Sequence, residues 1–71
     1  MKGRFVELCQ ERGVNLASVE VRGGKETSLR IRWYQQKFNI RSINARGFDL
    51  EDAWGDAYEK LLEALDAEIG P

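Results

Sequence analysis

A long amphipathic pattern near the C-terminus constrains the fold more than any other feature of this 71-residue chain. Apolar residues recur there at steps of three and four, which is the spacing of one face of an α-helix. The members of this apolar stripe are Leu50, Ala53, Trp54, Ala57, Tyr58, Leu61, Leu62, Leu65 and Ile69. Asp49 stands at the position of a helix N-cap, so the sequence predicts one helix over residues 49 to 69.

A shorter helical pattern opens the chain and predicts a helix over residues 2 to 12. Its apolar face consists of Phe5, Leu8 and Cys9. Gly13 follows where many helices end in the left-handed conformation. Val14 is then expected to fold back toward Cys9, as is usual at a helix end of this kind.

Three segments between the helices alternate apolar with polar residues, which is the period of a half-buried β-strand. The first covers residues 17 to 22 and the second covers residues 29 to 34. The third begins with Phe38 and Ile40 and predicts a strand that returns beside the second. Its alternation is broken at Ile43, which predicts a bulge or an early end of the strand just before that residue.

The loop between the first two strands is constrained by which residues face each other. A two-residue glycine turn would place apolar residues opposite polar ones, so it is excluded. A three-residue loop over residues 23 to 25 places Val19 opposite Leu29 and is the first choice. A five-residue loop over residues 23 to 27 is the alternative.

These patterns predict one α+β domain over residues 1 to 71, in the order α-β-β-β-α. We expect a small antiparallel three-stranded sheet with two helices packed on one face. The aromatic residues expected in the core are Phe5, Trp33, Phe38, Phe48 and Trp54. The 42% hydrophobic and 32% charged content is typical of a folded domain.

The residue types exclude several kinds of chemistry. The chain has no histidine, so histidine-dependent nucleophiles and histidine-bearing zinc sites are absent. Its single cysteine, Cys9, lies on an apolar face and is expected to be inert. We therefore expect a protein that is not an enzyme and uses no cofactor or metal. The lone cysteine and the absence of a long apolar run indicate a cytoplasmic protein that is not inserted in a membrane.

Charge divides sharply along the chain. Residues 1 to 46 carry ten basic and four acidic residues, and residues 47 to 71 carry one and eight, for net charges of +6 and −7. The long helix is expected to present an outward acidic row: Asp52, Asp56, Glu59, Glu63 and Asp66. The sheet face away from the helices is expected to be a basic face: Arg22, Arg30, Arg32, Tyr34, Lys37 and Arg41. Either surface is a candidate for partner binding, and either also fits an ordinary solvated surface.

The element order and the segment ELCQERG, residues 7 to 13, followed by a hairpin resemble the double-stranded-RNA-binding domain. In that family the second helix begins with a lysine-rich turn that holds phosphates. The corresponding segment here, FDLEDAW at residues 48 to 54, has three acids and no lysine. Arg46 is the one cation nearby. The resemblance therefore implies the fold, whereas the RNA-binding residues do not carry over.

The chain combines one compact α/β domain, no catalytic residues and an alanine-rich acidic last helix. In these features it looks like the small accessory proteins of phages and mobile elements, which implies action by binding, often as an inhibitor of a host protein or defence complex. Our leading hypothesis is a non-enzymatic protein of this kind, which binds a partner protein through the acidic row or the basic face. A nucleic-acid-binding domain that uses the basic face is the first alternative. A structural or self-associating protein, such as a homo-oligomer, is the second.

Overall fold

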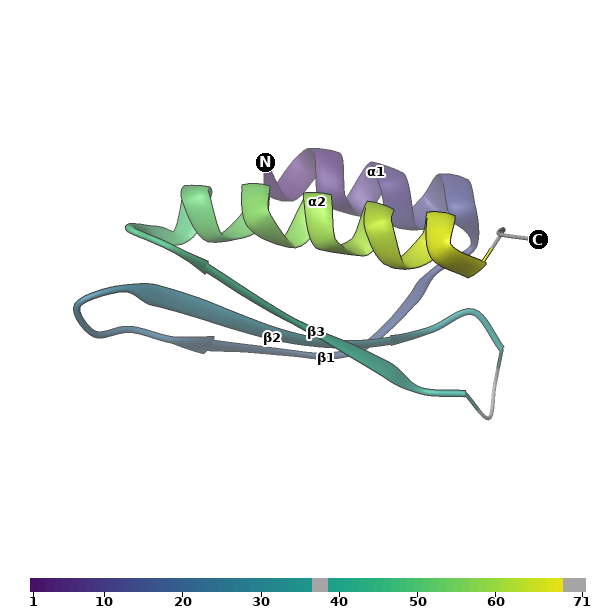
Figure 1. The fold of residues 1–71 in the computed structure, drawn as a ribbon, viewed down its shortest axis with the longest axis horizontal. Helices are drawn as coiled ribbons and strands as arrows, with labels where there is room; N and C mark the ends of the chain where they lie inside the picture. The colour runs from purple at the N-terminus through teal and green to yellow at the C-terminus, as the bar shows by residue number, and fades with distance from the viewer. Residues whose placement is uncertain (37–38, 69–71) are drawn as a thin grey trace.

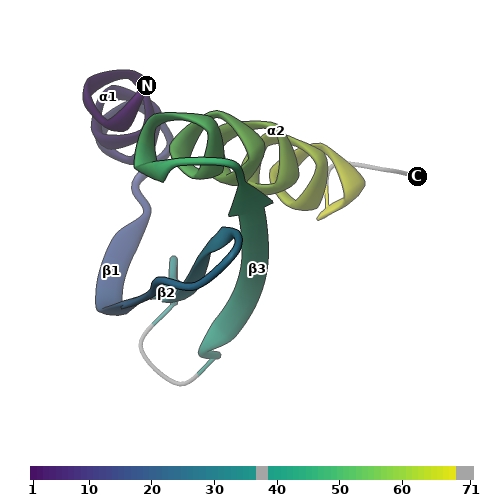
Figure 2. The ribbon, with the colours of Figure 1, turned by 90° about the vertical axis from the view of Figure 1, so that its left-hand side faces the viewer.

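The structure is a computed structural model that describes residues 1–36 and 39–68 (Figure 1). The elements are α1 (Lys2–Arg12), β1 (Asn15–Arg22), β2 (Thr27–Tyr34), β3 (Arg41–Gly47) and α2 (Leu50–Glu68). The strands form one antiparallel sheet in the order β1-β2-β3. Both helices lie on the same side of this sheet (Figures 1 and 2), which confirms the predicted α+β architecture.

The end of α1 has the predicted geometry. Gly13 adopts a left-handed conformation with φ 66°, which ends the helix. The backbone N–H of Val14 donates to the carbonyl oxygen of Cys9 at 2.8 Å. Val14 is buried, so the turn is anchored in the core as it directs the chain into β1.

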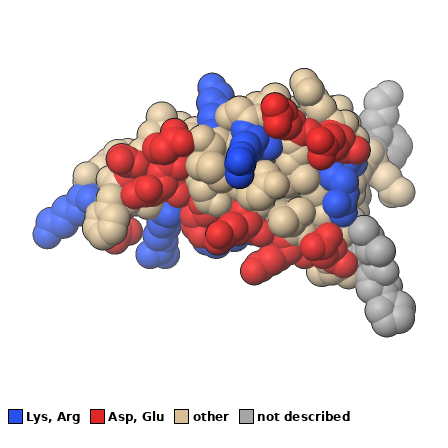
Figure 3. All heavy atoms as spheres, turned by 90° about the horizontal axis from the view of Figure 1, so that it is seen from above, with Lys and Arg blue, Asp and Glu red and all other residues tan. Residues whose placement is uncertain are grey.

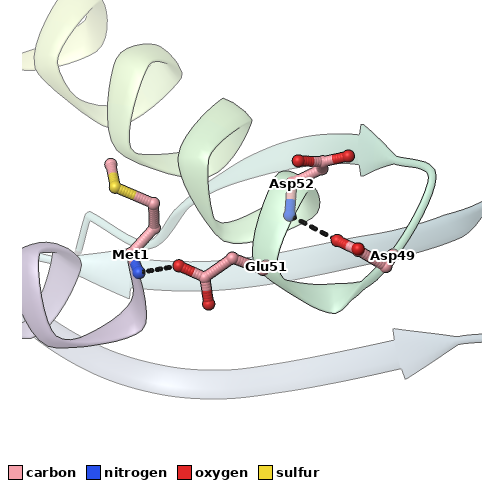
Figure 4. Close-up of polar contacts among 4 residues, drawn as sticks. All are labelled: Met1, Asp49, Glu51 and Asp52. Atoms are coloured by element: carbon pink, nitrogen blue, oxygen red, sulfur yellow. Dashed lines mark hydrogen bonds and ion pairs between the residues drawn. The ribbon is translucent and has the colours of Figure 1, made fainter.

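The start of α2 also follows the prediction, with Asp49 as the N-cap. Its Oδ1 accepts the backbone N–H of Asp52 at 2.9 Å (Figure 4). In the same view the carboxylate of Glu51 binds the α-amino group of Met1, which joins the first turns of the two helices. The predicted helix end at Ile69 and the residues after it lie outside the described residues.

The core lies between the helices and the sheet. Its buried residues are Phe5, Leu8, Cys9, Val14, Leu29, Ile31, Trp33, Ala45, Ala53, Trp54, Ala57, Leu61 and Leu65. Phe5 and Trp54 join α1 to α2, with ring centroids 5.2 Å apart. The predicted burial of Phe5, Trp33 and Trp54 is therefore confirmed, whereas Phe38 lies outside the described residues.

The predicted core position of Phe48 is wrong, because its side chain is 87% exposed. Phe48 stands in the short turn between β3 and α2, before the point where α2 meets the sheet. Leu50, in the first turn of α2, is also exposed, and the first buried residue of that helix is Ala53. The buried stripe of α2 therefore begins about one turn later than the apolar stripe of the sequence.

The hairpin uses the longer of the two predicted loops. Arg22 pairs with Ser28, and Val21 pairs with Leu29. The five-residue alternative over residues 23 to 27 is thus confirmed, and the three-residue loop is wrong. The longer loop has a physical advantage, since Val21 then faces an apolar residue instead of Thr27.

The third strand lies later in the chain than predicted. It begins at Arg41, and Ile40 lies before it with 61% of its surface exposed. Ile43 faces Ile31, and Ala45 faces Leu29 across the β2–β3 pair. Ile43 and Ala45 are therefore the residues of β3 that face the helices. The bulge expected just before Ile43 is absent from the pairing of β3 with β2.

The outer edge of β3 is closed by side chains of α2. Oδ2 of Asp56 accepts the backbone N–H of Arg46 at 2.9 Å. Nζ of Lys60 donates to the carbonyl oxygen of Asn44 at 2.6 Å. Two backbone groups that an edge strand would leave to solvent are therefore bonded within the domain.

Neither described helix combines the length and apolar character needed to cross a membrane.

Candidate binding surface

The sheet face away from the helices collects arginines from all three strands. Cross-strand partners share a face, so the register determines which residues lie together there. Two neighbouring rows across the sheet are Arg22–Ser28–Arg46 and Glu20–Arg30–Asn44. Arg32, opposite Ser18 and Ser42, lies in the next row. We call Arg22, Arg30, Arg32 and Arg46 the arginine face.

A shallow hollow of about 270 Å³ lies on this face. Its lining includes Arg22, Arg30 and Arg46, one from each strand. Ser28 and Asn44 also line it and add a hydroxyl and an amide. The hollow therefore brings charged and neutral hydrogen-bond donors together in one place, which suits an anionic group.

The charge of this face is available to an external partner. Arg22, Arg30, Arg32 and Arg46 are all exposed. Glu20 is the one acid on the two rows that line the hollow, opposite Arg30. Among the ion pairs of residues 1–36 and 39–68, none includes a guanidinium of the arginine face. Within the face, four cations stand against one carboxylate and give this surface a positive character, and the Asp56 carboxylate on α2 also interacts electrostatically with Arg46.

The predicted acidic row is partly engaged within the domain. Asp56 is half-buried, and its carboxylate bonds both the backbone N–H of Arg46 and the Nζ of Lys60, the latter at 3.0 Å. The bond from Arg46 and, to a smaller extent, the ammonium of Lys60 lower the pKa of Asp56 below its ordinary value. Asp66 at the far end of α2 lies 3.4 Å from the guanidinium of Arg12.

The other three members of the acidic row, Asp52, Glu59 and Glu63, are exposed on α2. Figure 3 looks down on the helix layer and shows acidic side chains along the length of the molecule, with basic side chains between them. Two of the five carboxylates already have partners in the domain, so fewer members of the acidic row are available to a partner protein than the sequence suggested.

Only some residues of the predicted basic face lie on the sheet face away from the helices. Arg22, Arg30 and Arg32 lie on it, and Tyr34 shares its side by strand alternation but is half-buried. The placement of Arg41 there is wrong, because it pairs with the buried Trp33 on the helix side of the sheet. Its guanidinium carbon lies 4.9 Å from the centroid of the Trp33 ring. Lys37 lies outside the described residues.

Two residues of this region were missed as binding candidates, Arg46 and Phe48. Arg46 belongs to the face only when β3 is read with Ile43 and Ala45 inward, which places Asn44 and Arg46 outward. The position of Phe48 at a helix entry predicts a core residue instead. The alternation around Ala45 is the sequence signal that identifies Arg46, but the exposure of Phe48 has no comparable signal.

No group of three or more potential metal-ligating side chains occurs among the described residues. Cys9 is buried, and burial raises the pKa of its thiol, which disfavours the reactive thiolate.

Comparison of the chain with protein-family models, curated proteins and solved structures gives no match.

Proposed function

We propose that this protein is a non-enzymatic binding protein that uses the arginine face to contact an acidic surface of a partner protein. The observation that carries this proposal is the hollow that Arg22, Arg30 and Arg46 line together. Planar guanidinium groups bind carboxylates in bidentate pairs, and arginine is enriched in protein interfaces. A hollow with donors from three strands favours a projecting carboxylate over a flat contact.

The arginine face is a better candidate than the acidic row. Asp56 and Asp66 are bound within the domain, so a partner would compete with existing contacts for these carboxylates. The arginines of the sheet face have no such ion pairs among the described residues. A partner therefore gains more interaction energy per charge from the sheet side.

A nucleic acid is the second candidate, because the same guanidinium groups also suit phosphates. One observation favours a protein. The acids at the start of α2 occupy the helix end where a phosphate would bind.

The resemblance to small phage accessory proteins supports a narrower proposal, in which the partner is a host protein that loses activity when bound. The features behind this resemblance are one compact α/β domain and an alanine-rich acidic last helix. The capture experiment below tests the narrower proposal by identifying the partner.

The test is affinity capture from a lysate of the native host, with and without nuclease treatment, followed by mass spectrometry. The wild-type chain should retain a specific protein, and Arg30→Glu should reduce its recovery by about tenfold, since reversing a central interface charge costs more than 1.4 kcal/mol. Arg4→Glu is the matched control, because it makes the same change of charge on exposed α1. Equal loss with both variants, or recovery that disappears on nuclease treatment, contradicts the proposal.

A further inference from the structure

Phe48 is the most exposed large apolar residue of the described chain, with 87% of its surface accessible. A single exposed apolar side chain is common on soluble proteins. Phe48 differs because of its neighbours, which include Arg46 of the arginine face two positions earlier. Aromatic residues beside arginines are the composition that dominates the energetics of protein interfaces.

The backbone around Phe48 is held on both sides. Gly47 lies so close to the first turn of α2 that a Cβ atom there would be 2.4 Å from the backbone nitrogen of Ala53. On the other side, Asp49 caps α2 through its bond to Asp52. The backbone that carries the ring is thus held in place, so a partner loses no binding energy in ordering this segment of the chain.

The surface beside Phe48 is continuous with the arginine face. A second hollow of about 190 Å³ is lined by Glu26, Arg46, Gly47 and Phe48. Arg46 also lines the larger hollow, so the two hollows share this residue. A ligand that extends over Arg46 therefore touches the cationic hollow on one side and the Phe48 ring on the other.

We propose that Phe48 is the apolar anchor of the arginine face, and that the segment bound there carries an apolar side chain next to its carboxylates. This inference rests on the proposed function and specifies the chemistry of the partner. The carboxylates of the segment lie among Arg22, Arg30 and Arg46, and the apolar side chain lies against Phe48. The carboxylate of Glu26 beside Phe48 sets this orientation, because it repels an acid placed at the aromatic end.

The experiment selects ligands from a random peptide display library on the immobilised full-length chain. We expect enrichment of peptides with Asp or Glu close to an aromatic or large aliphatic residue. Synthetic copies of the enriched peptides are then measured by fluorescence anisotropy. Phe48→Ser should weaken them by about tenfold and Arg30→Glu by at least as much, since each removes a central contact.

The control is Val6→Ser, which removes another exposed apolar side chain, on α1, and should leave peptide affinity within about twofold of wild type, as expected away from a contact. Phe48 is exposed, so its variant should keep the wild-type circular dichroism spectrum and thermal midpoint. Labelled single-stranded DNA and RNA oligonucleotides form a parallel arm of the experiment.

Each outcome decides between the two proposals. Acidic peptides that bind Phe48→Ser as tightly as wild type overturn the role of Phe48 and leave the arginine face as the contact surface. Enriched peptides that are insensitive to Arg30→Glu, or no enrichment at all, overturn both proposals. Oligonucleotide binding that depends on Phe48, together with weak peptide binding, overturns the assignment to a protein partner.

Discussion

At the scale of single residues, Gly47 and Asp49 determine how the sheet joins α2. Gly47 is required because β3 ends against the backbone of the helix, where a side chain has no room. Asp49 satisfies a backbone donor of the first turn. These residues position Phe48 between them, so the proposed anchor depends on a junction that is built for close packing.

Replacement of Gly47 by alanine should destabilise the domain by about 2 kcal/mol, in the range of other forced overpacking changes. The added Cβ would meet Ala53 and Asp52 at about 2.5 Å, and the backbone must move to relieve the contact. Urea denaturation followed by tryptophan fluorescence measures the change in the free energy of unfolding.

Gly55→Ala is the matched control, because a Cβ at Gly55 would lie 3.6 Å from Cγ of Met1, an ordinary contact. This variant should be stabilised by up to about 1 kcal/mol, since alanine favours the helical conformation. Equal stability of the Gly47→Ala variant and the wild type would show that the β3–α2 junction is looser than described.

At the scale of the elements, α2 does more than cover the core. Its Asp56 and Lys60 bond the outer edge of β3, so one helix both packs on the sheet and closes one of its edges. The charge of Asp56 is therefore used inside the domain. The pKa of this carboxyl is lowered mainly by the N–H of Arg46, which links the edge contact to pH.

The lowered pKa predicts a specific dependence of stability on pH. A carboxyl whose pKa is lower in the folded state stabilises that state above its unfolded value, near 3.8, and the contribution is lost as pH falls through the folded pKa. Asp56→Asn keeps an acceptor for Arg46 but removes the charge. The variant should thus be less stable than wild type at about pH 6, and the difference should shrink toward about pH 2.

Urea denaturation across this pH range measures the effect. Glu59→Gln removes a neighbouring exposed charge of the same helix and should follow the wild-type profile. A difference between wild type and Asp56→Asn that does not change with pH would mean that the carboxylate charge plays no part in the contact.

The helices were predictable from sequence because their signals are local. Apolar residues at steps of three and four indicate a helix, and Gly13 and Asp49 mark helix ends. Each of these signals involves only a few neighbouring residues. The third strand was misplaced because pairing with β2 decides which of its residues face the core. From the sequence alone, Ile43 could either interrupt the inward alternation of Phe38 and Ile40 or itself be an inward residue of the strand. The same error hid Arg46 and moved Arg41 to the wrong side of the sheet.

The candidate surface was therefore only partly predictable. Arg22, Arg30 and Arg32 lie on strands whose alternation is clear in the sequence, and they are on the predicted face. Helical spacing predicts Asp56 as an outward acid, because it does not show that β3 lies within reach of this side chain. The sequence predicts Phe48 as a core residue, because its exposure depends on where α2 first meets the sheet.

At the scale of the whole molecule, charge is distributed between two sides. The sheet side carries the arginine face, and the helix side carries the exposed acids Asp52, Glu59 and Glu63 of the acidic row. An acidic partner is attracted to the first side and repelled by the second, so the domain has a preferred orientation of approach. Its affinity should also decrease as salt rises.

The central claim is that the sheet side binds the partner, and the most direct measurement compares charge reversal on the two sides. The affinity of the captured protein is measured by calorimetry for Arg22→Glu/Arg30→Glu/Arg32→Glu and for Asp52→Lys/Glu59→Lys/Glu63→Lys. The first variant should lose at least about a hundredfold in affinity, and the second should stay within about threefold of wild type or bind more tightly. A large loss with the helix variant and little change with the sheet variant would contradict the claim.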